Sequence, residues 1–189
     1  AGSWTPRSDG FPKGLKPLGD AAKKRDMGFV LWFEPERVTP NSLIAKEHPE
    51  WVLHVNNGNT SPCGQDLTQN ELFYLGNSEA RKWLADMLAE RMIESGVTVY
   101  RQDFNIFGVS EFWKSNDSPD RVGATENFHI QGLYAMWDEL LDRVPGLSID
   151  NCASGGRRID LEMISRSYPL WQSDTQCCGK AMPIQDQTQ

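Results

Sequence analysis

Residues 28–36 read GFVLWFEPE, an apolar run that stops at Glu34-Pro35-Glu36. The run carries no charged side chain before Glu34. A short uninterrupted apolar stretch of this kind is typical of a strand that is buried on both faces of a sheet. We therefore expect a strand over residues 28–33, with carboxylates at its carboxyl end.

The chain on either side of this run alternates between helical and strand patterns. Apolar residues at helical spacing precede each expected strand, and each strand ends in polar residues. The expected pairs of helix and strand are 15–22 with 28–33, 78–93 with 97–100, 128–141 with 147–149 and, with weaker spacing, 161–164 with 168–171.

This alternation predicts an α/β fold, because neighbouring parallel strands need a helical crossover between them. An open doubly wound sheet and a closed eight-stranded barrel both fit. Polar residues after all four expected strands favour the barrel, whose rim collects its site from several strand ends. A whole barrel takes about 250 residues, so we predict a partial (β/α)8 TIM barrel, with residues 1–189 as a fragment of one domain. Segments 56–69 and 107–123 are expected to be long rim loops.

The composition is that of a folded protein without affinity for nucleic acid or membranes. Hydrophobic residues make up 39% of the chain, and the net charge is −7. No apolar run approaches the roughly 20 residues of a membrane helix. No export signal is visible, so we expect a soluble protein and favour the cytoplasm. The four cysteines show no CxxC spacing, so we expect no zinc site, disulfide framework or cofactor.

Asp103 and Asp174 each follow a different expected strand. Glycoside hydrolysis requires two carboxylates, one at the anomeric carbon and one that protonates the leaving oxygen. A separation of about 5–5.5 Å gives retention of configuration and about 6.5–9.5 Å gives inversion, and sequence spacing decides neither. Helix capping is the alternative role for each aspartate.

Three further side chains are candidates for a sugar site. Arg101 lies two residues before Asp103, so on a strand both point to the same side, where the cation would keep Asp103 ionised. A structural ion pair is the alternative for Arg101. Trp32 and Trp171 lie beside polar strand ends and could wall a sugar ring, although tryptophan also fills cores.

Other motifs favour structural roles. Glu34 and Glu36 could be catalytic, but we expect Arg37 to pair with a neighbouring acid and to brace the rim. Gly155-Gly156 and the two arginines after it are a weak phosphate cradle, since neither GxGxxG nor a following Lys-Ser/Thr is present. Cys152 has no histidine nearby in the sequence, which disfavours a thiol nucleophile. A histidine metal site is disfavoured as well.

Four strings occur in order along the chain: LWFEPE at 31–36, RQDFN at 101–105, NCASGGRRID at 151–160 and LWQSD at 170–174. Together they resemble the α-galactosidases of glycoside hydrolase family 36, and weaker agreement covers nearly the whole chain. The resemblance implies an eight-stranded barrel and a retaining exo-glycosidase that removes terminal α-galactose. An α-galactoside oligosaccharide is then the expected partner.

The resemblance also implies roles for individual residues. Asp103 matches the nucleophile of the family and Asp174 its acid/base. A pair of aspartates on an earlier strand of the family would precede residue 1, so the chain would span roughly the third to sixth barrel strands. We expect it to be inactive alone, and an oligomer is possible in the full-length parent. The implied substrate-binding residues are Trp32, Arg101, Asn105, Cys152, Gly155, Arg158 and Trp171.

Departures from the family pattern keep other functions open. Arg101-Gln102 replaces the family's Lys-Trp, and Arg157 stands where members often have a third glycine. A guanidinium is no simple substitute for an ammonium. An α-N-acetylgalactosaminidase or a related retaining α-glycosidase is therefore the alternative among glycosidases. A non-catalytic sugar-binding barrel and an open-sheet phosphate enzyme are the alternatives outside them.

Overall fold

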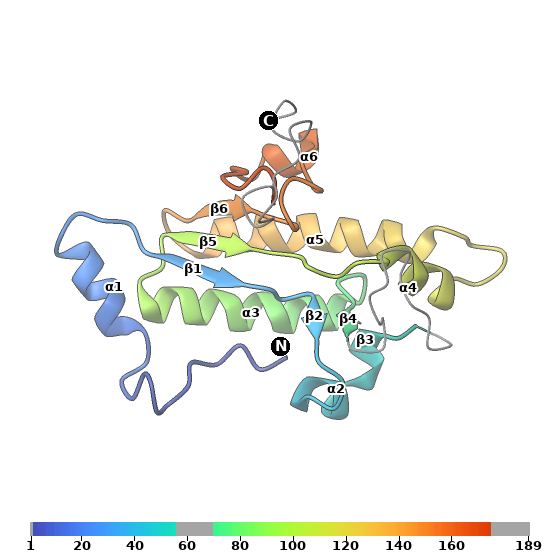
Figure 1. Ribbon diagram of the computed structural model, residues 1–189, viewed down its shortest axis with the longest axis horizontal. Coiled ribbons are helices and arrows are strands. Elements are labelled where there is room, and N and C mark those ends of the chain that lie inside the picture. Colours follow the sequence, from blue (N-terminus) through green and yellow to red (C-terminus); the bar gives the residue numbers. More distant parts are fainter. Residues whose placement is uncertain (1, 56–69, 175–189) are drawn as a thin grey trace.

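Three parallel strands form the central sheet of the computed structural model, which describes residues 2–55 and 70–174 (Figure 1). In spatial order they are β1 (Val30–Phe33), β5 (Val99–Gln102) and β6 (Ser148–Asn151). Parallel neighbours need long crossovers, and the chain returns to this sheet through a helix each time.

Two long helices make these crossovers and cover one face of the sheet (Figure 1). α3 (Ser78–Ser95) precedes β5, α5 (Ala124–Arg143) precedes β6, and the two helices pack against each other. α1 (Lys16–Lys23) packs against α3. Gly96 caps the carboxyl end of α3 with a left-handed φ of 70°. The fully buried side chains between helices and sheet include Leu84, Leu88, Met92, Tyr100, Met136, Trp137, Leu140 and Ile149.

The opposite face of the sheet carries a polar row. Trp32 is the register partner of Arg101, and Arg101 is the register partner of Asp150. Because successive side chains of a strand alternate between faces, these three point away from Tyr100 and Ile149, which belong to the helix-facing core. The polar row therefore lies on the face that the two long helices leave open.

A small antiparallel sheet occupies the connection between β1 and α3. Its strands β2 (Arg37–Val38), β4 (Glu71–Phe73) and β3 (Val52–Leu53) pair in that order. α2 (Leu43–Glu47) and the 3₁₀ helix η1 (Pro49–Trp51) lie between β2 and β3 in the chain. The sequence patterns predicted none of these elements, because so few residues show no period. The side chains that anchor them in the main core include Val38, Ile44, Trp51 and Phe73.

The predicted α/β class with a parallel sheet is confirmed, but the fourth expected strand, 168–171, is wrong. Tyr168 forms a single parallel bridge with Asp150. Pro169 has no N–H, and the N–H of Leu170 is taken by the carbonyl of Tyr168 and the carboxylate of Asp150. The ladder therefore ends after one pair. The described residues form an open three-stranded sheet and not a closed barrel.

Two smaller expectations also need correction. β1 is not buried on both faces: it is an edge strand of the described sheet, and Val30 and Trp32 are about half exposed. Segment 107–123 is not one long loop, since it contains α4 (Val109–Asn116), whose Phe112 and Trp113 are buried. Segment 56–69 lies outside the described residues. The short helix expected at 161–164 is present as α6 (Leu161–Ile164).

No helix in residues 2–55 and 70–174 combines the length and the apolar character that crossing a membrane requires.

Candidate active site

Several of the predicted site residues gather at the carboxyl ends of the parallel strands. Asp103 follows β5 directly, and its backbone N–H donates to the carbonyl of Phe33 at 2.9 Å. Cys152 follows β6, and its N–H donates to the carbonyl of Gln102 at 2.9 Å. Parallel pairing thus continues one residue past each strand. It brings Asp103 next to the loop after β6.

Donors from three segments hold the Asp103 carboxylate. Its Oδ1 accepts hydrogen bonds from the N–H of Phe104 at 2.8 Å and from the N–H of Ser154 at 3.3 Å. Its Oδ2 accepts one from the indole N–H of Trp32 at 3.2 Å. The side chain of Asp103 remains partly exposed, so it is oriented and still accessible.

These surroundings favour the ionised form of Asp103. Burial by itself raises the pKa of a carboxyl group, but the hydrogen bonds outweigh burial here, and the pKa of Asp103 lies below its usual value. The donors are the Asn105 side chain, the two backbone N–H groups and the Cys152 thiol. An ionised carboxylate at neutral pH is the state that a nucleophile needs.

The loop after β6, residues 152–156, contacts the second predicted catalytic residue as well. Ser154 and Gly155 have left-handed φ values of 50° and 82°. A Cβ atom at Gly155 would lie 2.8 Å from the Cα of Ser173 and 3.1 Å from the backbone nitrogen of Asp174. Glycine is therefore required for this approach. The 152–156 loop touches both predicted catalytic residues, by hydrogen bond to Asp103 and by backbone packing against Asp174.

Asp174 is partly exposed and lies beside Trp171. Its Oδ1 accepts a hydrogen bond from the indole N–H of Trp171 at 2.7 Å. Burial lowers the pKa of Arg157, and the negative charges of Asp174 and Asp103 oppose that effect. One guanidinium thus lies within electrostatic reach of both carboxylates.

Arg101 forms an ion pair with Asp150, its register partner on β6, and not with Asp103. This is the structural ion pair that was predicted as the alternative role of Arg101. The Asp150 side chain is 3% exposed, and its Oδ1 also accepts from the N–H of Leu170 at 3.1 Å. The guanidinium of Arg101 lies 5.9 Å from the centre of the Trp171 ring. Arg101 therefore compensates a buried carboxylate and supports the indole beside Asp174.

The expected brace at the turn after β1 is confirmed. Arg37 pairs with the buried carboxylate of Glu34. The Oε1 of Glu34 accepts from the N–H of Asn105 at 2.8 Å, and the Oδ1 of Asn105 accepts from the hydroxyl of Ser154 at 2.7 Å. The turn is thereby tied to the segment that carries Asp103.

Glu36 is fully buried and accepts hydrogen bonds from three side chains. Arg158 donates to its two oxygens at 2.7 and 2.9 Å, Gln102 donates at 2.8 Å, and Nε2 of His129 lies at 2.7 Å. Since Nδ1 of His129 accepts from the N–H of Leu75, its Nε2 carries the proton and donates. Burial alone would raise the pKa of Glu36, but the charge of Arg158 and these hydrogen bonds hold it well below its usual range.

Sequence reasoning did not select Ser154 or Asp150 for the site. Asp150 could have been found from the sequence, because it directly follows the expected buried strand 147–149, and a buried carboxylate needs a cation or hydrogen-bond donors beside it. Ser154 could not have been found in this way, because it contributes a backbone N–H to Asp103, and every residue except proline carries one.

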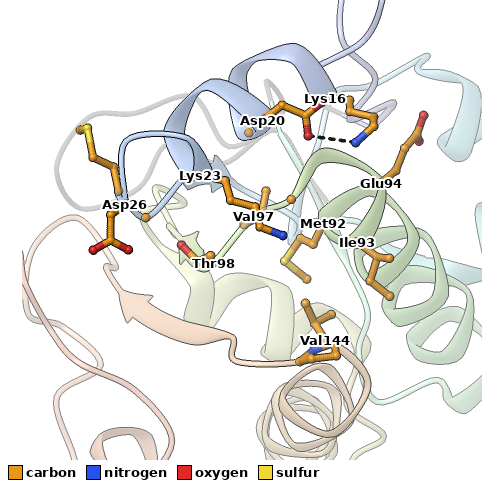
Figure 2. Close-up of a pocket in the computed structure, with 15 residues that line it drawn as sticks. Lys16, Asp20, Lys23, Asp26, Met92, Ile93, Glu94, Val97, Thr98 and Val144 are labelled. Atoms are coloured by element: carbon orange, nitrogen blue, oxygen red, sulfur yellow. Dashed lines mark hydrogen bonds and ion pairs between the residues drawn. The ribbon is translucent and has the colours of Figure 1, made fainter.

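Two hollows lie elsewhere beside the sheet. One, of about 600 Å³, lies between α1, α3 and the residues before β5 and β6 (Figure 2). It is therefore at the amino ends of these strands, whereas Asp103 follows the carboxyl end of β5. The other, of about 630 Å³, lies between the N-terminal segment and β1 and reaches Trp32. The walls of the hollow in Figure 2 include Lys23, Met92, Val97, Thr98 and Val144.

Within residues 2–55 and 70–174, no three His, Cys, Asp or Glu side chains are placed to hold a metal ion. Cys152 is buried, and burial raises the pKa of its thiol to about 11. A protonated thiol is a poor nucleophile, and the Cys152 thiol makes a hydrogen bond to Asp103.

The sequence matches the family model described as Melibiase over residues 1–189. The probable α-galactosidase C of Aspergillus flavus is 32% identical over 181 residues, which cover 92% of this chain and 22% of that protein. The α-galactosidase AgaA of Geobacillus stearothermophilus is 29% identical over 184 residues, which cover 97% of this chain and 25% of that protein. The chain thus spans about a quarter or less of the length of these relatives.

Solved structures show the same likeness. The GH36 α-galactosidase AgaB from Geobacillus stearothermophilus superposes with a TM-score of 0.78 at 28% identity, covering 92% of this chain and 23% of that one. A variant of AgaA in complex with stachyose gives a TM-score of 0.77 at 27% identity, with coverages of 92% and 23%. The resemblance drawn from the four strings is confirmed.

Proposed function

Because the chain belongs to the Melibiase family, we propose that the protein of which it forms part is a retaining α-galactosidase. Its substrates would be oligosaccharides with terminal α-D-galactosyl residues. The observation that carries this proposal is the contact of one loop, residues 152–156, with both Asp103 and Asp174. Structures of the relative AgaA in complex with stachyose and with raffinose support this class of substrate.

Asp103 acts as the nucleophile and Asp174 as the acid/base. In the first step a carboxylate oxygen of Asp103 bonds to the anomeric carbon, while Asp174 gives its proton to the leaving oxygen and the glycosidic bond breaks. In the second step water gives a proton to Asp174 and attacks the same carbon, which breaks the ester to Asp103. Two displacements restore the original configuration.

The geometry suits this division of roles. Asp103 is held in its ionised form by surrounding donors, as attack requires. The indole N–H groups of Trp32 and Trp171 each orient one carboxylate while the rings line the site.

We assign sugar contact to the side chains that surround these carboxylates and to the backbone at Gly155. Arg158 belongs to the predicted set as well, but its guanidinium lies on Glu36 and on the Phe104 ring, so we assign it an indirect role. The direct contacts in this proposal are Trp32, Arg101, Asn105, Cys152, Gly155 and Trp171.

Residues 1–189 would form part of one barrel domain, roughly its third to sixth strands. The open face of the sheet, with its row of Trp32, Arg101 and Asp150, would then line the barrel interior. Within residues 2–55 and 70–174 the outer edge of β1 has no neighbouring strand in the parallel sheet. An exposed strand edge is a liability for a separate fold, so we expect no turnover from this chain alone.

An α-N-acetylgalactosaminidase is the second candidate, because Arg101 stands where the family has lysine and its guanidinium is engaged by Asp150. A phosphate enzyme is disfavoured, because the two glycines that would bind the phosphate, Gly155 and Gly156, instead pack against residues 172–174. A Cβ atom at Gly156 would lie 2.6 Å from the carbonyl oxygen of Gln172.

The proposal is tested on the full-length protein with p-nitrophenyl α-D-galactopyranoside and its α-N-acetylgalactosaminide counterpart. Faster hydrolysis of the galactoside, with α-galactose as the first anomer seen by NMR, is the expected result. A fluorinated galactose mimic should leave an ester on the peptide that contains Asp103. If β-galactose is the first anomer released, the enzyme inverts configuration. If no ester forms on the Asp103 peptide, the protein is a sugar-binding module and not a retaining glycosidase.

A further inference from the structure

Arg158 joins the carboxyl ends of all three parallel strands. Its guanidinium grips Glu36, which follows β1, through two hydrogen bonds of 2.7 and 2.9 Å. The same guanidinium lies 4.0 Å from the centre of the Phe104 ring, and Phe104 follows β5 next to Asp103. Arg158 itself follows β6.

The backbone of Arg158 is hydrogen-bonded to the residue that precedes the 152–156 loop, so the two ends of this loop are held together. The side-chain amide of Asn151, the last residue of β6, donates to the carbonyl of Arg158 at 2.9 Å. Within this closure the N–H of Ala153 donates to the carbonyl of Gly155 at 2.9 Å. The 152–156 loop is thus held at its base, and the base is anchored to Glu36.

The anchor is buried and specific in its geometry. The Glu36 side chain is 0% exposed and the Arg158 side chain 14% exposed. Two parallel N–H donors on one carboxylate fix orientation as well as distance. His129 and Gln102 hold Glu36 from other sides, so the carboxylate that Arg158 grips is itself immobilised.

We propose that Arg158 and Glu36 form a positioning pair for Asp103 and Asp174. The pair holds the 152–156 loop where Ser154 donates to Asp103 and where Gly155 receives the backbone of Asp174. This inference rests on the proposed function, which assigns catalysis to those two carboxylates. Double displacement depends on their separation, and a misplacement of about 1 Å can cost about 100-fold in rate.

The test is Arg158→Lys in the full-length protein. Lysine keeps a cation beside buried Glu36 but loses the paired donors and the stacking on Phe104. We expect kcat for p-nitrophenyl α-D-galactopyranoside to fall about 10- to 100-fold. KM should change less than about threefold, because the contacts to substrate remain.

Arg166→Lys is the matched control. Arg166 also grips a carboxylate with two donors, at 2.6 and 3.2 Å from Asp138 of α5. This pair lies on the helix side of the fold, so its loss should leave kcat within about twofold of wild type.

A second measurement needs no turnover. Hydrogen–deuterium exchange of peptides that cover residues 152–158 should accelerate in Arg158→Lys, while peptides of α3 keep their rates. If the wild-type protein hydrolyses no galactoside, the proposed function fails, and exchange still decides whether Arg158 holds the loop.

Unchanged exchange of the loop overturns the inference, and so does an active Arg158→Lys protein with wild-type kcat. Should the lysine variant fail to fold, Glu36→Gln combined with Arg158→Gln leaves no unpaired buried charge. In that double variant we again expect a lower kcat for the aryl galactoside and faster hydrogen–deuterium exchange of residues 152–158.

Discussion

The backbone N–H of Ser154 donates a hydrogen bond to Oδ1 of Asp103 at 3.3 Å, although 51 residues separate them in the chain. Parallel pairing of β5 with β6 makes this contact possible, since it brings the two strand ends together. The next residue, Gly155, packs against the backbone of Asp174. A change in the register of β5 against β6 would move Ser154 and Gly155 away from Asp103, so the site depends on how these two strands pair.

Replacing Asp174 with asparagine should separate substrates by their leaving groups. Asparagine keeps the shape of the side chain but donates no proton to a departing sugar, so hydrolysis of raffinose should fall by about 10²- to 10⁴-fold. The p-nitrophenyl galactoside should lose less in its first step, because nitrophenolate leaves without a proton. Steady-state and burst kinetics measure both, and Asp142→Asn on the exposed side of α5 is the control. Equal losses on both substrates would refute the acid/base role.

Asn105→Ala should shift the acidic limb of kcat/KM to higher pH. The Asn105 side chain is a donor that lowers the pKa of Asp103 against the opposing effect of burial. Without it that pKa rises, so the nucleophile becomes protonated earlier as the pH falls. A pH profile on the aryl galactoside checks the shift, with exposed Asn127→Ala of α5 as the control. An acidic limb identical to wild type would contradict the assignment.

The Cys152 thiol should resist alkylation near neutral pH. Burial raises its pKa from 9.0 to about 11, which lowers the thiolate fraction at pH 8 about 100-fold. Peptide mapping after iodoacetamide treatment, with and without denaturant, measures this protection. Rapid labelling of the native protein at pH 8 would be inconsistent with the burial of Cys152.

The Cys152 thiol should make the folded protein less stable as the pH rises into the alkaline range. Its folded-state pKa lies above the unfolded value, so its contribution is complete below about pH 9 and is lost as the pH rises towards 11. The melting temperature of Cys152→Ala should therefore decline less between these pH values than that of wild type. Parallel slopes would contradict this.

Gly132→Ala in α5 should lower the melting temperature. Alanine usually favours a helix over glycine by about 1 kcal/mol, but a Cβ atom here would lie 2.0 Å from the carbonyl oxygen of Leu75. Overpacking of this kind costs about 1–3 kcal/mol, and the obstacle is backbone. Gln131→Ala, one residue away and exposed, is the control. A variant as stable as wild type would show that α5 packs differently.

Sequence patterns predicted the elements in which regularly spaced or continuous apolar residues extend over four residues or more. The expected helices over 78–93 and 128–141 are present as α3 and α5, and strands lie close to 28–33, 97–100 and 147–149. β2, β3 and β4 escaped prediction because they have only two or three residues each. The expected strand at 168–171 failed because Pro169 and the doubly engaged N–H of Leu170 stop the ladder.

Of the candidate site, the chain by itself determined which chemical groups stand at the strand ends: Asp103, Cys152 and the glycines after it. Those are local properties, set by where apolar runs stop. Only the tertiary structure decided the partners, because Arg101 meets Asp150 across 49 residues and Arg158 meets Glu36 across 122. Such pairings follow from strand register and helical crossovers, which bring together groups that no local pattern relates.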